Sequence, residues 1–291
     1  MMRPRSSLNG LGVKLTLLLI VFGSTQGCAQ TQTPVQGANW SDKNAIANDT
    51  QRASAWKLLE EGARERNGEK RAKMIRALGL LGAEPEAVEL AEAGLTDKEP
   101  EVRAAAARVL GEMGSIKSVP KLMAATSDKK ISVAFAAAHS LLALKSDAGY
   151  EVYYAVMTGK RKSGGMIEQQ WDELKEPKKA AEFAFEQGIG FVPYAGAALE
   201  AFQMLTKKDP SPVRAAAATA LASDPDPRSG AALVQALKDK NWIVRVAALR
   251  AIAVRGEQAA LEVVEAATQD KRDEVRFAAA AAVLKLTEGS K

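Results

Sequence analysis

Residues able to do chemistry are few in this chain of 291 residues, which holds one histidine, His139, and one cysteine, Cys28. A typical zinc site built from histidine and cysteine ligands is therefore excluded within the chain. His139 has no evident partner, so no Ser/His/Asp triad can be argued. No segment matches the phosphate loop Gly-x-x-x-x-Gly-Lys-Ser/Thr. We expect no catalytic residue, no cofactor and no metal ion.

The N-terminal residues have the pattern of a targeting segment. Arg3, Arg5 and Lys14 form a positively charged start, and an apolar run follows over Leu15–Phe22. A membrane-spanning helix needs about 20 apolar residues, so this run is too short to span. It is typical of the apolar region of a signal peptide, which we expect over residues 1–27.

Cys28 directly follows this segment and is a candidate site of lipidation. Thr25-Gln26-Gly27-Cys28 resembles the lipobox of bacterial lipoproteins, which implies lipidation of Cys28. Gly27 fits the lipobox, but Thr25 stands where leucine is usual. The alternative is ordinary cleavage after Ala29, because Gly27 and Ala29 are small residues at the two positions that such cleavage requires. Lipidation would place the protein on the periplasmic face of a bacterial membrane, with Ala29 favouring the outer membrane. Otherwise we expect a periplasmic or secreted protein.

Charge and composition change once the signal segment is set aside. The whole chain has 40 basic and 35 acidic residues and a net charge of +5. Three of the basic residues and none of the acidic ones lie in 1–27, which leaves 37 basic against 35 acidic residues, or +2. No basic stripe recurs along the repeats described below, so we do not expect nucleic acid as a partner. Residues 28–50 are polar and predict a flexible tether.

A repeated pattern runs through the rest of the chain. The full pattern has an aspartate, a valine five residues later, an arginine directly after the valine, and then an alanine-rich run. Two copies depart from it, because Ala134 follows Val133 and Lys208 stands five residues before Val213. The repeated valines are Val102, Val133, Val213, Val244 and Val275. Three of the four intervals between them are equal, and a constant short interval is typical of a solenoid of stacked repeats. An earlier and weaker copy shares the pattern Arg-x-Leu-Gly-x-x-Gly over 76–82 and 108–114.

Each copy predicts a pair of helices. Residues 100–113 place their apolar side chains on one helical face, and we expect Gly111 and Gly114 to end this first helix. A second helix follows after a short turn, as in 117–126 or 257–268. One pair cannot bury its own apolar face, so neighbouring pairs must stack and share a core. Because small alanine side chains let helices approach closely, we predict an all-α solenoid of stacked antiparallel helix pairs.

The repeats resemble HEAT repeats, in particular the short HEAT-like repeats found in phycobilisome lyases. The resemblance is carried by Asp97/Val102/Arg103, Asp239/Val244/Arg245 and Asp270/Val275/Arg276. It implies that aspartate and arginine side chains form a structural ladder between adjacent repeats, and a guanidinium can bind a carboxylate in this way through two hydrogen bonds. The residues expected in this ladder are Asp97, Arg103, Arg214, Asp239, Arg245, Asp270 and Arg276.

One segment interrupts the pattern. Between N-terminal repeats over 51–158 and C-terminal repeats over 207–291, residues 159–206 do not follow the repeat. We expect a divergent helical insertion with a Gly/Pro-rich apolar loop at 188–196. Its aromatic residues could simply fill a core. Alternatively, Ile189, Phe191, Val192 and Tyr194 could be exposed and contact a partner or a membrane.

These features favour a non-catalytic scaffold or adaptor, expected to be a monomer. It would bind a protein or peptide partner on a concave surface lined by the second helices. Two alternatives remain. One is a protein that handles a chromophore or other ligand, by analogy with the phycobilisome lyases, and this analogy rests on fold alone. The other is a membrane-engaging protein that acts through the 188–196 loop.

Overall fold

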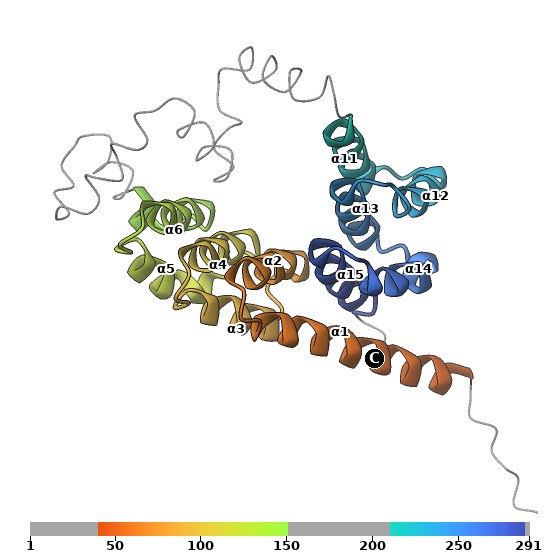
Figure 1. Cartoon of the computed structure of the whole chain (residues 1–291), viewed down its shortest axis with the longest axis horizontal. Coiled ribbons are helices and arrows are strands. Elements are labelled where there is room, and N and C mark those ends of the chain that lie inside the picture. The colour runs from red at the N-terminus through yellow and green to blue at the C-terminus, as the bar shows by residue number, and fades with distance from the viewer. Residues whose placement is uncertain (1–39, 151–209, 289–291) are drawn as a thin grey trace, which may run out of the picture. The chain divides into compact units, whose positions relative to one another are not determined.

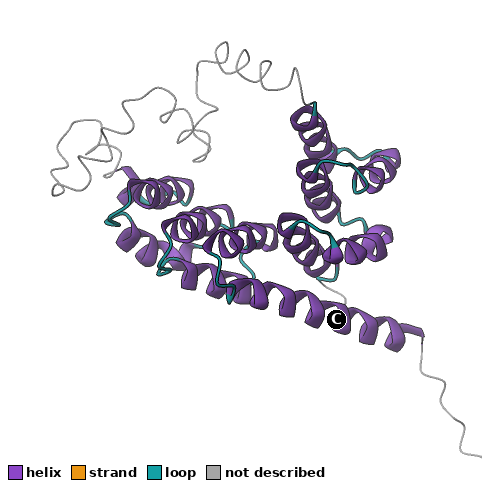
Figure 2. Ribbon diagram, viewed as in Figure 1, coloured by secondary structure: helices purple, strands orange, loops and turns teal. Residues whose placement is uncertain are grey.

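The computed structural model describes residues 40–150 and 210–288, with side chains from residue 47 onward. These residues form helices and connecting turns and contain no strand (Figure 2). The predicted all-α solenoid of stacked antiparallel helix pairs is confirmed. The helices are α1 (Trp40–Ala63), α2 (Gly68–Leu78), α3 (Pro85–Gly94), α4 (Pro100–Glu112), α5 (Val119–Ala125), α6 (Ile131–Ala143), α11 (Ser211–Ala220), α12 (Pro227–Ala236), α13 (Trp242–Arg255), α14 (Leu261–Ala266) and α15 (Asp273–Leu286).

Helix α4 shows why the repeat folds as it does. Pro100 begins the helix, where a missing backbone N–H costs nothing. Val102 and the alanine-rich run after it are buried, since α4 packs between α2 and α6. Of the two glycines expected to end this helix, Gly114 follows its end with a φ of +70°, whereas Gly111 lies inside it. A Cβ at Gly111 would lie 2.5 Å from the Cβ of Ser140 in α6, so this glycine permits close packing.

The helices form two layers whose order differs from the order of the chain. The first helices of the pairs contact one another in the spatial order α11, α13, α15, α2, α4 and α6 (Figure 1). The last helix of the chain, α15, therefore packs against α2, the first helix of the first repeat. The two predicted repeat regions are thus joined directly through α15 and α2, although they are far apart in sequence.

Helix α1 completes the second layer at this junction. Each second helix packs against the first helix that follows it, as α3 does on α4 and α14 does on α15. Helix α1 contacts both α2 and α15, so it takes the place of the second helix between them. Helix α1, the first helix among the described residues, therefore lies in the middle of the stack.

The structure corrects the predicted tether over 28–50, because α1 begins at Trp40. Most side chains over 40–50 are polar, which is why this part of the helix was predicted to be a tether. Its helical form is stabilised by packing, since Ala55 and Leu59 are buried, and helices in proteins depend mostly on such contacts. Residues 28–39 and the predicted insertion over 159–206 lie outside the described residues.

Candidate functional site

The most regular polar feature is a ladder of arginine–aspartate pairs between adjacent repeats. In each pair, the arginine donates from Nε and Nη2 to the two oxygens of an aspartate 25 or 26 residues later. The N···O distances run from 2.7 to 3.1 Å. The pairs are Arg71–Asp97, Arg103–Asp128, Arg214–Asp239 and Arg245–Asp270.

The remaining hydrogen-bonding groups of these pairs are also engaged. Nη1 of Arg103 donates to the backbone carbonyls of Asp97 and Lys98, and Arg245 repeats this arrangement in its own repeat. Asp97 accepts a hydrogen bond from the backbone amide of Glu99, so it also fixes the turn before α4. Each arginine thus binds the turn before its own helix and the aspartate of the next repeat, so the role of the pair is structural.

Electrostatics keep these aspartates ionised. The hydrogen bond from Arg71 lowers the pKa of Asp97 and outweighs the opposing effect of burial. The hydrogen bond from Arg214 likewise lowers the pKa of Asp239. A general acid or base working near neutral pH needs a pKa close to that pH, and these shifts move away from it. The ladder carboxylates are therefore poorly suited to acid–base chemistry.

Burial of the ladder falls off at α11. Arg103 and Arg245 are 7% and 6% exposed, as expected between two packed repeats. Val213 of α11 is 47% exposed, although Val102 at the same repeat position is 1% exposed. Helix α11 is the first described helix of its end of the stack, so no described first helix precedes it there.

Arg276 differs from the ladder predicted for it. It donates from Nη1 to Asp273, three residues earlier in the chain, at 3.2 Å. In the stack, α15 is followed by α2. The turn before α2 has Glu65 where other repeats have the ladder aspartate, because Glu65 precedes Arg71 by six residues, as Asp97 precedes Arg103. Glu65 contacts Lys70 at 3.5 Å instead.

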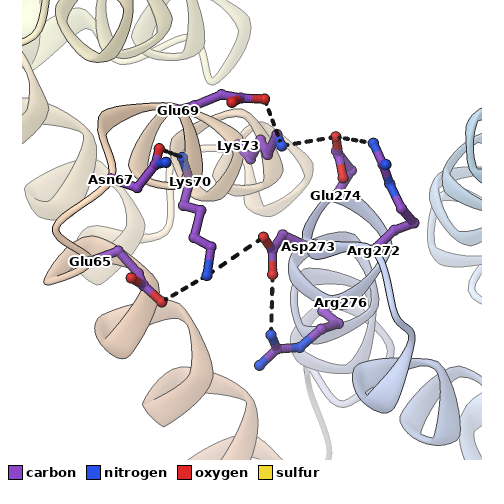
Figure 3. A network of polar contacts seen from close by, with 9 residues as sticks. All are labelled: Glu65, Asn67, Glu69, Lys70, Lys73, Arg272, Asp273, Glu274 and Arg276. Carbon is purple, nitrogen blue, oxygen red and sulfur yellow. Dashed lines mark hydrogen bonds and ion pairs between the residues drawn. The ribbon is translucent and has the colours of Figure 1, made fainter.

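A network of charged side chains replaces the ladder pair at this junction (Figure 3). Lys70 lies 3.9 Å from Asp273, and Lys73 bridges Glu69 and Glu274 at 2.8 and 3.2 Å. Lys70 stands at the repeat position that Val102 has in α4. Because the valine is replaced, this copy does not match the repeated pattern in the sequence. The junction between α2 and α15 is thus polar at its edge, where other repeats have valine.

Helix α1 adds hydrogen bonds across the same junction. Arg52 donates to the carbonyl of Leu284 and to the hydroxyl of Thr287, and it lies 3.5 Å from Glu84. One side chain of α1 therefore links α15 to the start of α3. On the first-helix side, Arg250 of α13 donates to the carbonyl of Arg76 at 3.0 Å.

Two of the grooves among the described residues lie on the layer of second helices. The larger, of about 630 Å³, lies between α3 and α5 and is lined by Glu89, Glu92, Ala93, Leu95, Thr96, Lys121, Ala124, Ala125, Ser127 and Asp128. Glu92 accepts hydrogen bonds from Ser118 and Lys121, whereas the carboxylate of Glu89 makes no hydrogen bond or ion pair with a described residue. The smaller groove, of about 440 Å³, lies between α1 and the helices α14 and α15, and it includes Arg276.

Several predicted residues fall elsewhere. Cys28, Ile189, Phe191, Val192 and Tyr194 lie outside the described residues, so their roles stay predictions. His139 is exposed on α6. Within residues 40–150 and 210–288, no three side chains are grouped as metal ligands, and no helix is both long and apolar enough to cross a bilayer.

Sequence reasoning missed two ladder members. Arg71 donates to Asp97, and Asp128 accepts from Arg103. The signal for Arg71 was its place in the chain, because it precedes Arg103 by the same interval that separates the two Arg-x-Leu-Gly motifs. Asp128 stands at the aspartate position of its copy. It was not predicted to join the ladder because no arginine follows Val133 in that copy.

Comparison with known proteins gives a family but no near relative. No curated protein matches the chain. Among solved structures, human deoxyhypusine hydroxylase in complex with glycerol is 16% identical, with a TM-score of 0.29, over 84% of this chain and 96% of that one. The complex of CpcE and CpcF of phycocyanin lyase from Nostoc sp. is 22% identical, with a TM-score of 0.31, over 88% and 90%. The family model for HEAT repeats matches residues 57–147 and 199–285, more than half of the chain. The chain belongs to the HEAT-repeat family.

Proposed function

We propose that this protein is an exported, lipid-anchored, non-catalytic adaptor that binds a protein or peptide partner on its layer of second helices. Repeat solenoids present long surfaces that suit such binding. The observation that carries the proposal is the open groove between α3 and α5, which offers exposed side chains and an uncommitted carboxylate at Glu89. The ladder carboxylates are committed to structure, which supports a binding role over catalysis.

The binding part of the proposal is tested by filling this groove. Ala93 is exposed and lines the groove, so Ala93→Arg should place a long side chain in it without disturbing the core. We expect the affinity for the partner to fall by about tenfold, equivalent to about 1.4 kcal/mol. The measurement is quantitative recovery of the partner from a periplasmic fraction by the purified wild-type and variant chains.

A matched control is available on the other side of the junction. Ala259→Arg makes the same change at an exposed position in the turn before α14 and should leave recovery unchanged. Equal recovery by wild type and Ala93→Arg would count against the groove. Equal loss in both variants would show a general effect of added charge and would also contradict the proposal.

The anchoring part depends on Cys28, the one cysteine of the chain. When the chain is expressed in a bacterium, we expect the wild type in the membrane fraction and Cys28→Ser in the soluble fraction, because serine cannot carry the thioether-linked lipid. Labelling with a radioactive fatty acid should disappear in the same variant. A Cys28→Ser chain that stays with the membrane would show that lipidation is not the attachment.

A further inference from the structure

A basic side chain stands in each turn that leads into the first helices α13, α15, α2, α4 and α6. In four of these turns, the ladder aspartate accepts a hydrogen bond from the backbone amide two residues later, and a lysine stands between the two. An arginine holds the same place after Glu65 in the turn before α2. All five side chains are exposed, and none of them makes a hydrogen bond or ion pair with a described residue. They form a basic row of Arg66, Lys98, Lys129, Lys240 and Lys271.

The basic row is continuous along the stack, because neighbouring turns contact one another. The guanidinium of Arg272 lies 5.3 Å from the ring of Trp242, which joins the turns before α15 and α13. The charged network between α15 and α2 joins the next two turns (Figure 3). A Cβ at Gly68 would lie 2.5 Å from Cγ of Glu99, so the turns before α2 and α4 also meet, and the ladder joins α4 to α6. The expectation that no basic stripe recurs along the repeats is therefore wrong for these turns.

The acidic groups of these turns are mostly committed to other partners. Each ladder aspartate binds an arginine of the preceding repeat, and the acidic residues at the starts of α2 and α15 pair with basic residues of the junction network. Lys130 adds an exposed basic side chain beside Lys129. Glu99 and Glu101 make no ion pair with a described residue and oppose Lys98 in the middle of the row. Six uncommitted basic side chains thus face two uncommitted acidic ones, so this edge of the stack is positive.

The spacing of the basic row fits an extended polypeptide. Packed helices lie about 8–10 Å apart, so successive members of the row follow at about this interval. Three residues of an extended chain span about 10 Å. A segment with an acidic residue at every third position therefore places one carboxylate against each repeat.

The direction of α1 favours a protein partner over a bilayer. The C-terminal end of α1 leads into the turn that carries Arg66, so this end lies at the edge with the basic row. Its 24 residues make a helix about 36 Å long, and the chain that precedes Trp40 enters at the other end. A lipid anchor at Cys28 therefore attaches to the end of α1 opposite the row.

We propose that the basic row binds an extended acidic segment of the protein partner, with a glutamate or aspartate at every third residue. Each carboxylate of the segment forms an ion pair with one member of the row. The inference rests on the proposed function, since it names the chemistry of the partner and adds a second contact surface to the groove between α3 and α5.

The test measures the binding of synthetic peptides to the chain from residue 28 onward with Cys28→Ser, at an ionic strength of about 0.15 M. A peptide of Glu-Gly-Ser triplets, one for each member of the row, should bind severalfold more tightly than a peptide of the same composition with its glutamates consecutive. The triple variant Lys98→Gln, Lys240→Gln and Lys271→Gln should weaken binding of the triplet peptide by about tenfold. Glu101→Gln should strengthen it, because it removes an opposing charge.

The control is a second triple variant with the same change in net charge. Lys57→Gln, Lys117→Gln and Lys145→Gln replace exposed lysines outside the row and should leave binding unchanged. Equal loss in the two triple variants would overturn the row, and equal binding of the two glutamate arrangements would overturn the extended geometry. Binding of phosphatidylglycerol vesicles or single-stranded DNA by the row, without binding of the triplet peptide, would overturn the peptide as its occupant.

The outcomes also separate this inference from the proposed function. If the wild type does not bind the triplet peptide but recovers a partner that Ala93→Arg loses, the acidic segment is overturned and the adaptor function stands. If the wild type binds no peptide and recovers no partner, both are contradicted.

Discussion

Replacing Asp270 with alanine should lower the free energy of unfolding by about 3 kcal/mol, because it leaves a buried charge without its partner. Arg245 is 6% exposed and would keep only its backbone acceptors. Asp270 also accepts a hydrogen bond from the backbone amide of Arg272, so the turn before α15 would lose a contact as well. Urea denaturation followed by circular dichroism measures the effect.

The control for this change is a pair that is exposed. Glu60→Ala removes the contact of Glu60 with Arg64 within α1 and should cost no more than about 0.5 kcal/mol. Replacing both members of the buried pair, as in Arg245→Met with Asp270→Leu, should be less harmful than Asp270→Ala alone. A loss of similar size in Glu60→Ala and Asp270→Ala would contradict the structural role of the ladder.

The effect of Asp270→Ala should also depend on pH. Burial raises the pKa of Asp270, but hydrogen bonds from Arg245 and from the backbone outweigh it, and the net shift is downward. A carboxylate with a lowered pKa stabilises the fold above its unfolded-state pKa of about 3.9, and this stabilisation disappears as the pH falls through the folded-state value. The difference between wild type and variant should therefore be full at neutral pH and shrink below about pH 4. A constant difference across this range would contradict the ion pair.

Replacing Gly62 with leucine should lower the free energy of unfolding by about 3 kcal/mol, because the site has no room for a side chain. Gly62 is the point at which α1 meets both neighbouring first helices. A Cβ there would lie 2.7 Å from Cε1 of Phe277 in α15 and 2.9 Å from Cγ of Met74 in α2. The added side chain must therefore separate α1 from α15, from α2 or from both.

Hydrogen exchange can show where Gly62→Leu acts. We expect faster exchange at amides of α15, which is far from Gly62 in the sequence, as well as in α2, while α6 should be unaffected. Ala53→Leu, at an exposed position of the same helix, should leave exchange and stability unchanged. Faster exchange confined to α2 would contradict the placement of α1 against α15.

The repeat unit could be predicted from sequence because its signals are local. The valine and the alanine-rich run recur at the same interval in three of four cases, and each stands close to its partners in the chain. The contact of α15 with α2 carries no such signal, because a period states the spacing of repeats and not which ends meet. Helix α1 escaped notice for a related reason: its buried positions, Ala55, Leu59 and Gly62, include no large apolar run.

The candidate site was less accessible to sequence reasoning than the fold. Arg276 was expected to be an ordinary ladder member because its own copy of the repeat is intact. Its difference arises in another segment, where Glu65 and Lys70 replace the aspartate and valine of the usual copy. The predictions for Cys28 and for the 188–196 loop stand outside the described residues.

The central position of α1 has a consequence for the order of folding. An open solenoid can form from one end and propagate by contacts between neighbours. In this chain, α15 packs against both α1 and α2. The ribosome must therefore synthesise residues up to 286 before these contacts can form. Contacts at such long separation raise the contact order and slow folding, because loop closure precedes the gain in contact energy. Until then, the surfaces of α1 and α2 that α15 covers are exposed to water. Folding of the N-terminal repeats is therefore complete only after the C-terminal repeats have been made.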